Sequence, residues 1–209
     1  YTFLSVLNLS ENLAEAIEDI SLLFIYIMLA SALPWFFFGQ DLLVPAVYSV
    51  VLTLCFWRIN SKKLSLEYLG FVKKELAANC FLGLVVGVPM GVIEYLILRP
   101  PAPTAAFSQG YFLQTALHMF LFVALGEEIL FRALIQKTIL KVTGVVPGIF
   151  WSAVIFAAMH TVWRSVPELF FTFVAGLVLG IVYQKTGSIA GPIFLHGTNN
   201  LVLLAVMPY

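Results

Sequence analysis

Residues 111–140 read YFLQTALHMFLFVALGEEILFRALIQKTIL, and much of the architecture follows from this run. Its length and apolar content predict a membrane-spanning helix, because about 20 residues at a rise of 1.5 Å each cross the hydrocarbon of a bilayer. The run also contains two adjacent carboxylates, Glu127 and Glu128, and the guanidinium of Arg132. A charge at the bilayer centre costs about 3 kcal/mol or more, so these residues need partners or a function.

The composition is that of an integral membrane protein. Of the 209 residues, 61% are hydrophobic and 11% are charged, and the mean hydropathy is +0.99. Soluble domains have about 45–50% apolar and about 25% charged residues. The formal net charge is zero and the sequence has no basic block, so it lacks the charge that nucleic-acid binding needs. We expect a lipid bilayer around the protein and no nucleic-acid partner.

Seven apolar runs are counted as membrane-spanning helices, with about 20 residues needed for each crossing. They are residues 21–39, 42–57, 76–98, 111–140, 145–162, 169–184 and 189–207. Residues 8–20 have apolar and acidic faces, typical of an amphipathic interfacial helix or of the solvated first turns of the next span. A tight turn at Gln40 and Asp41 is expected between the first two runs. If this turn is absent, the number of spans changes by one. The sequence thus predicts an all-α, polytopic transmembrane bundle of about seven spans, or eight, forming one domain over residues 1–209.

Lysine and arginine are unevenly divided between the two ends of these runs. One side has Arg99 and Arg164, and the other has Arg58, Lys62, Lys63, Lys73, Lys74, Lys137, Lys141 and Lys185. The positive-inside rule therefore places residues 58–75 and the start of the chain in the cytoplasm. We expect a multi-pass protein of the plasma (inner) membrane.

Small residues recur at helical spacing in two of the runs. Gly83, Gly87 and Gly91 are each four residues apart, as are Gly176 and Gly180. Such spacing lets helix backbones approach closely, so it predicts packing seams within the bundle. A groove for substrate entry is the alternative interpretation.

Few strongly polar residues remain inside the spans. They are Glu94, His118, Glu127, Glu128, Arg132, His160, His196, Asn199 and Asn200. Counted from the cytoplasmic ends at 1.5 Å per residue, Glu127 and His160 lie about 20 Å deep, His196 about 12 Å and Asn200 about 18 Å. Three helices thus bring polar groups to one layer, and we expect a site near the cytoplasmic half of the bilayer. His118 is expected to bond to another helix instead, and Glu94 to face the external side.

Spacing along each helix divides these residues into groups. Glu128 and Arg132 are i, i+4, so they share a face and can form a charge-assisted pair. Glu127, turned by about 100°, has no evident local partner. His196 and Asn200 are also i, i+4 and project together. The sequence therefore offers a free carboxylate, imidazoles and an amide, supported by a neutralised Glu–Arg pair.

This set of groups is suited to hydrolysis. A carboxylate beside an imidazole can deprotonate water, and His and Asn can donate hydrogen bonds to the oxyanion formed when that water attacks a carbonyl. No metal is required, but Glu127, His160 and His196 would also suit Zn²⁺ with an open fourth position. A transporter is the non-enzyme alternative, because buried acids and histidines also build proton relays.

Three motifs in the last part of the chain resemble, in order and spacing, the signature motifs of a known family. They are Glu127-Glu128-x-x-x-Arg132, Phe156-x-x-x-His160 and His196-x-x-x-Asn200. The family is that of the CAAX protease and bacteriocin-processing (CPBP) intramembrane proteases, which includes the type II CAAX prenyl endopeptidases. Its members that act on prenylated proteins usually have eight spans, whereas seven are counted here.

The resemblance implies a membrane peptidase with a catalytic core over residues 111–207. In that family the first Glu and first His activate water, roles that correspond here to Glu127 and His160. The second His and the Asn stabilise the oxyanion, which corresponds here to His196 and Asn200. The implied substrate is a membrane-associated protein or peptide, lipidated or not. A scaffold, immunity or regulatory role is the non-catalytic alternative within the family.

Overall fold

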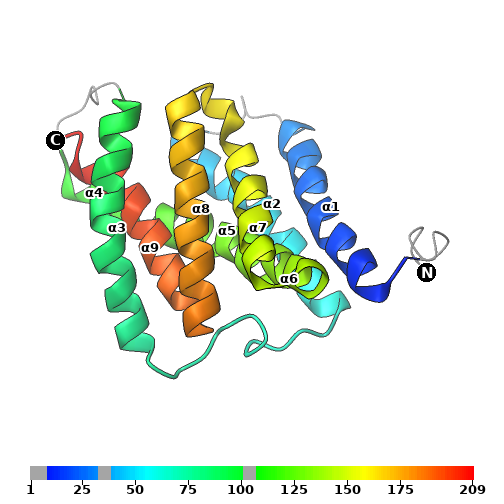
Figure 1. Cartoon of the computed structure of the whole chain (residues 1–209). Helices are drawn as coiled ribbons and strands as arrows, with labels where there is room; N and C mark the ends of the chain where they lie inside the picture. Colours follow the sequence, from blue (N-terminus) through cyan, green and yellow to red (C-terminus); the bar gives the residue numbers. More distant parts are fainter. Residues whose placement is uncertain (1–8, 33–38, 101–106) are drawn as a thin grey trace.

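The computed structural model describes residues 9–32, 39–100 and 107–209, and every regular element in these ranges is a helix. The described helices form seven rods that lie side by side in a bundle (Figure 1). They are α1 (Glu11–Ala32), α2 (Gln40–Ser61), α3 (Leu76–Leu98), a long rod over residues 109–143, α7 (Val145–Met159), α8 (Val166–Thr186) and α9 (Ala190–Leu201). The predicted all-helical architecture is confirmed, and each predicted apolar run corresponds to one rod.

The amphipathic segment expected at residues 8–20 is not a separate helix. α1 begins at Glu11 and continues without a break to Ala32, so this segment supplies its first turns. Ion pairs attach its acidic face to neighbouring helices. They join Arg58 of α2 to Asp19 (2.5 Å) and Glu18 (2.8 Å), and Lys141 to Glu15 (2.7 Å). The acids thus hold α1 to the bundle.

The start of α2 corrects another expectation. Gln40 and Asp41 lie in the first turn of α2 instead of forming a connecting turn, and residues 33–38 lie outside the described residues. Within the described chain, residues Leu42–Ser61, Leu76–Leu98 and Val166–Thr186 are long and apolar enough to cross a membrane. Residues Val145–Met159 and Ala190–Val206 are apolar but shorter. These helices identify a membrane protein, while the count of seven spans stays a prediction.

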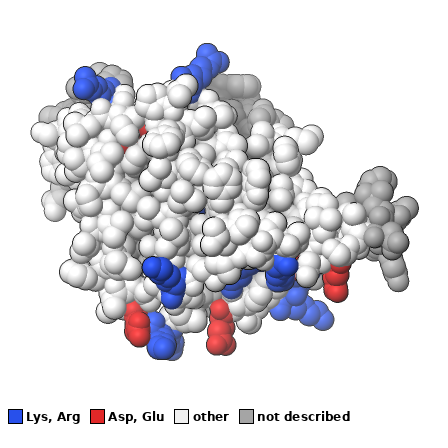
Figure 2. Space-filling model, viewed as in Figure 1, with Lys and Arg blue, Asp and Glu red and all other residues white. Residues whose placement is uncertain are grey.

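Charge is concentrated at the two ends of the bundle. On the face seen in Figure 2, most charged side chains lie along the lower edge, where α2 ends and α3 begins, and a few basic ones lie at the upper edge. Between them is a broad band with few charged side chains. α3 and α8 carry exposed apolar side chains such as Phe81 and Phe170. This distribution is typical of a bundle whose middle lies in hydrocarbon.

α3 packs against α9 along the glycine seam predicted from spacing. A Cβ built on any of the three glycines would lie 2.5–2.6 Å from a carbonyl oxygen of α9. The contacts are Gly83 with Gly191, Gly87 with Leu195 and Gly91 with Asn199. Because the numbers rise together, the two helices run in the same direction. The seam therefore fixes the height of α9, which carries two of the candidate site residues.

The rod over residues 109–143 is not a uniform α-helix. It consists of α4 (Gln109–His118), η3 (Met119–Ala124), α5 (Leu125–Glu128), η4 (Ile129–Gln136) and α6 (Lys137–Thr143), of which η3 and η4 are π-helical. π-helical turns are rare and occur frequently at functional sites. The short α5 carries both glutamates and lies behind α7 and α8 in the view of Figure 1.

Candidate active site

Glu128 connects two helices at the centre of the bundle. Its side chain is fully buried, and its Oε2 accepts a hydrogen bond from Nε of Arg132 at 2.9 Å, which is the pair that the i, i+4 spacing predicts. Its Oε1 lies 2.8 Å from Nδ1 of His196 on α9. An ionised carboxylate can only accept hydrogen bonds, so Nδ1 of His196 must be the donor. We therefore place a ring proton of His196 on Nδ1.

Phe156 covers the other side of Arg132. The Nη1 and Nη2 atoms of Arg132 have no hydrogen-bond partner among the described residues. Its Cζ lies 4.7 Å from the centroid of the Phe156 ring, a cation–π geometry. The same ring packs against His160 and His196, with centroids 4.8 and 5.9 Å apart. Phe156 therefore links the buried cation to both imidazoles.

Glu127 has a partner that sequence reasoning missed. The Tyr48 hydroxyl of α2 donates a hydrogen bond to its Oε1 at 2.6 Å. Its buried Oε2 accepts no hydrogen bond from the described residues and lies 3.9 Å from Nε2 of His196. That distance is too long for a hydrogen bond. Buried carboxylate oxygens without a donor are uncommon in native proteins, and a catalytic role is one explanation.

Three of the predicted site residues line one cavity. His160, His196 and Asn200 border a cavity of about 20 Å³ enclosed by α3, α7, α8 and α9. About 10–15 Å³ of such volume is enough to hold one water molecule. Glu127 is not among the lining residues and lies instead beside His196. The structure thus brings His160, His196 and Asn200 together and places Glu127 next to the group.

His160 stands where α7 ends. The helix stops at Met159, earlier than the predicted run, and His160 opens the 3₁₀ turn η5 (His160–Trp163). Its Nδ1 lies 3.0 Å from the carbonyl oxygen of Phe156, which can only accept, so Nδ1 is the donor in this bond. The ring is half-buried. Its Nε2 carries the free lone pair and is the nitrogen that can take up a proton.

The cavity lies toward the bundle end that bears Arg99 and Arg164. Glu94, which also lines it, is four residues before the end of α3, and His160 directly follows the last residue of α7. A site in the cytoplasmic half stays a prediction, and with the lysine-rich end in the cytoplasm the cavity would lie nearer the opposite end of the bundle. Depths counted along helices ignore tilt, and α9 is visibly tilted against α3 in Figure 1.

The zinc alternative does not fit the side chains as they are placed. Among the described residues, no three His, Cys, Asp or Glu side chains are grouped as a metal ion requires. His196 bonds through Nδ1 to Glu128, and its Nε2 is directed toward Glu127. Glu127, His160 and His196 therefore form no common ligand set.

Three further polar residues belong to the surroundings of the cavity. Glu94, expected to face the external side, is buried and accepts a hydrogen bond from Asn199. Glu168, near the start of α8, is only 1% exposed. Glu168 directly precedes the predicted run 169–184, so it is not counted among the polar residues inside the spans. Asn199 is counted among them without an assigned role. Neither Tyr48 nor Glu168 carries a local signal in the sequence.

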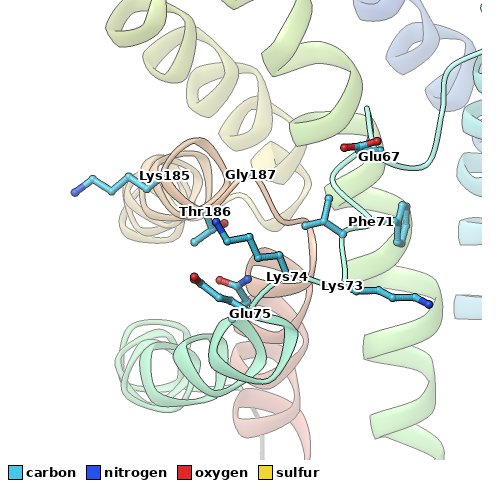
Figure 3. Close-up of a pocket in the computed structure, with 10 residues that line it drawn as sticks. Glu67, Phe71, Lys73, Lys74, Glu75, Lys185, Thr186 and Gly187 are labelled. Atoms are coloured by element: carbon cyan, nitrogen blue, oxygen red, sulfur yellow. The ribbon is translucent and has the colours of Figure 1, made fainter.

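A larger hollow at the lysine-rich end is not the candidate site. It measures about 730 Å³ and lies between residues 67–75, the start of α3 and the end of α8. Figure 3 shows Lys73 and Lys185 pointing away from one another, while Lys74 points toward Thr186. The three ammonium groups do not converge on one anion, and none of the motif residues lines the hollow.

Comparison with known proteins gives one match. Residues 109–202 match the family model described as type II CAAX prenyl endopeptidase Rce1-like. The matched segment starts with α4 and ends just after α9, so it contains all three motifs. Neither the curated proteins nor the solved structures gave a match.

Proposed function

Residues 109–202 belong to the Rce1-like family of type II CAAX prenyl endopeptidases, and on that basis we propose that the protein is a membrane endopeptidase that hydrolyses a peptide bond of a membrane-associated protein or peptide. One observation carries the proposal: His160, His196 and Asn200 surround a cavity of the size of a water molecule. A peptidase without a covalent intermediate needs a base for water and donors for the oxyanion. The cavity wall provides both kinds of group.

In the proposed reaction, water in the cavity loses a proton and its oxygen adds to the carbonyl carbon of the substrate. The groups that can accept this proton are the free Nε2 of His160 and the carboxylate of Glu127. The π electrons of the carbonyl move to its oxygen, which accepts a hydrogen bond from Nδ2 of Asn200. His196 provides the second donor in its doubly protonated form, in which Nδ1–H binds Glu128 and Nε2–H is left for the oxyanion. When the intermediate collapses, the C–N bond breaks and the proton taken from water passes to the leaving nitrogen.

Glu127 is arranged to take part although it does not line the cavity. Its Oε1 is held by Tyr48, and its Oε2 is bound by no described residue. Turning Oε2 from His196 toward the water therefore breaks no hydrogen bond at that oxygen. A loosely held carboxylate oxygen beside an imidazole is what a mobile proton acceptor requires.

The test is cleavage by purified protein in lipid vesicles, with prenylated and unmodified forms of the same membrane-anchored peptides as substrates. Glu127→Gln and His160→Ala should each lower kcat by about 10²-fold or more, the usual contribution of a general base. Both proteins should keep the wild-type melting temperature. His118→Ala is the matched control, because His118 lies on the same rod as Glu127 and contacts the ring of Phe122, outside the cavity.

Turnover by either active-site variant at the wild-type rate would overturn the assignment. A scaffold would be revealed if both variants supported growth or immunity as well as the wild type in a complementation assay. Comparing the two peptide forms identifies whether lipidation is required.

A further inference from the structure

Glu168 is turned into the bundle although its position predicts a different role. It is the third residue after Ser165, whose hydroxyl accepts a hydrogen bond from the Glu168 backbone N–H at 3.3 Å. In a capping box, a Glu at this position returns its carboxylate to the backbone of the capping residue. Here the carboxylate is buried, and neither of its oxygens has a hydrogen-bond partner among the described residues. Its neighbour is the carboxyl group of Glu94.

Glu94 and Glu168 therefore form a pair of carboxyl groups between α3 and α8. The end of α3 and the start of α8 lie at the same end of the bundle (Figure 1), and the two carboxyl groups are close enough to interact. Two ionised carboxylates in contact within a dry interior would repel one another. One proton held by the pair would remove that repulsion.

The pair is connected to the cavity through two adjacent amides. Glu94 accepts a hydrogen bond from Nδ2 of Asn199. The same NH₂ group donates to Oδ1 of Asn200 at 3.2 Å. An amide NH₂ has two hydrogens, so Asn199 is fully used as a donor. With its oxygen occupied in this way, Asn200 has its own Nδ2 left to donate into the cavity that it lines.

We propose that Glu94 is a positioning residue that acts through Asn199 to direct the Nδ2 of Asn200 toward the oxyanion. The inference rests on the proposed peptidase function and extends it to α3. Glu94 lies outside the segment that matches the family model, so the motifs themselves do not include it. Without the acceptor at Glu94, the Asn199 amide could rotate and release the oxygen of Asn200.

The main test compares two substitutions of Glu94 of similar size. In Glu94→Gln, the side-chain oxygen still accepts from Asn199 and the NH₂ group donates to Glu168, so kcat should stay close to the wild-type value. In Glu94→Leu the acceptor is lost, and kcat should fall about tenfold to a hundredfold. This loss is smaller than that caused by removing an oxyanion donor itself, which lowers kcat by about 10²–10³-fold. A role in positioning predicts an unchanged KM, because Glu94 acts on Asn200 through Asn199 and not through binding of the substrate.

Asn199→Ala provides the second variant if Glu94→Leu does not fold. It leaves the carboxyl pair intact and removes the donor to Asn200, so it should give the same fall in kcat at constant KM. Ser152→Ala is the control, because it removes a buried hydroxyl of α7 whose hydrogen bond goes to the backbone of Phe131. Its kcat should match the wild type.

An infrared measurement tests the carboxyl pair independently of activity. The wild type should show the C=O band of a protonated carboxyl group, and Glu94→Gln and Glu168→Gln should each lack it. Absence of that band in the wild type, or unchanged kcat in both Glu94→Leu and Asn199→Ala, would overturn the inference while leaving the peptidase proposal intact. Failure of the peptidase proposal gives a different result, namely undiminished cleavage by Glu127→Gln.

Discussion

At the scale of single residues, Arg132 shows how a charge is kept in the interior of this bundle. One edge of its guanidinium binds the carboxylate of Glu128, and its face lies over the ring of Phe156. Glu128 in turn accepts from His196, so the cation, the carboxylate and the imidazole form a continuous buried chain. Removing any one member leaves a charge or a lone pair without compensation.

Arg132→Leu should therefore destabilise the protein strongly. It leaves Glu128 as a buried carboxylate without its cation, and breaking a buried pair in this way costs about 3–5 kcal/mol. The melting temperature in detergent measures the loss. Lys141→Leu is the matched control, because Lys141 pairs with Glu15 at a half-exposed position, where such pairs contribute about 0–1 kcal/mol. Equal melting temperatures for the two variants would contradict this account of Arg132.

At the scale of elements, the contact of α3 with α9 sets the position of the site. The glycines of α3 admit the carbonyl oxygens of α9 at distances that leave no space for a side chain. Because His196 and Asn200 stand on α9, any separation of these helices changes the cavity. Packing of small residues is thus part of the placement of the catalytic groups.

Gly87→Ala tests this role of the seam. The new Cβ would lie 2.5 Å from the Leu195 carbonyl oxygen and 2.8 Å from Cβ of Thr198, so α9 must move. Overpacking of this kind costs about 1–3 kcal/mol, and we expect a lower melting temperature together with slower peptide cleavage. Gly110→Ala is the control, because a Cβ there has no neighbour within 4 Å and Ala favours the helix. A Gly87→Ala protein as stable and active as the control would disprove the seam's importance.

At the scale of the whole molecule, the cavity and the lysine-rich surface lie toward opposite ends of the bundle. The positive-inside rule places the lysine-rich end in the cytoplasm. The proposed cleavage would then take place in the outer half of the bilayer. Membrane orientation consequently decides from which side a substrate reaches the site.

Cysteine labelling with a membrane-impermeant maleimide measures this orientation. In a Cys55→Ala, Cys80→Ala background, Lys63→Cys should react only after cells are opened, and Gln109→Cys should react in intact cells. Both positions are exposed and lie at opposite ends of the bundle. The reverse pattern would invert the topology and turn the cavity toward the cytoplasm.

The sequence by itself determined the features that depend on neighbours along the chain. The apolar runs gave the helices, because burial in hydrocarbon requires every backbone group to bond within its own segment. The i, i+4 spacing gave the bond between Glu128 and Arg132, and glycine spacing gave the seam between α3 and α9.

Only the tertiary structure decided which distant groups meet. Tyr48 reaches Glu127 across 79 residues, and His196 binds Glu128 across 68, through contacts that no local pattern encodes. The π-helical turns of η3 and η4 also depart from the 3.6-residue period on which facing arguments rest. Glu168 has the sequence position of the glutamate of a capping box, yet its side chain is buried, because the direction of a side chain at a helix end depends on the helix packed beside it.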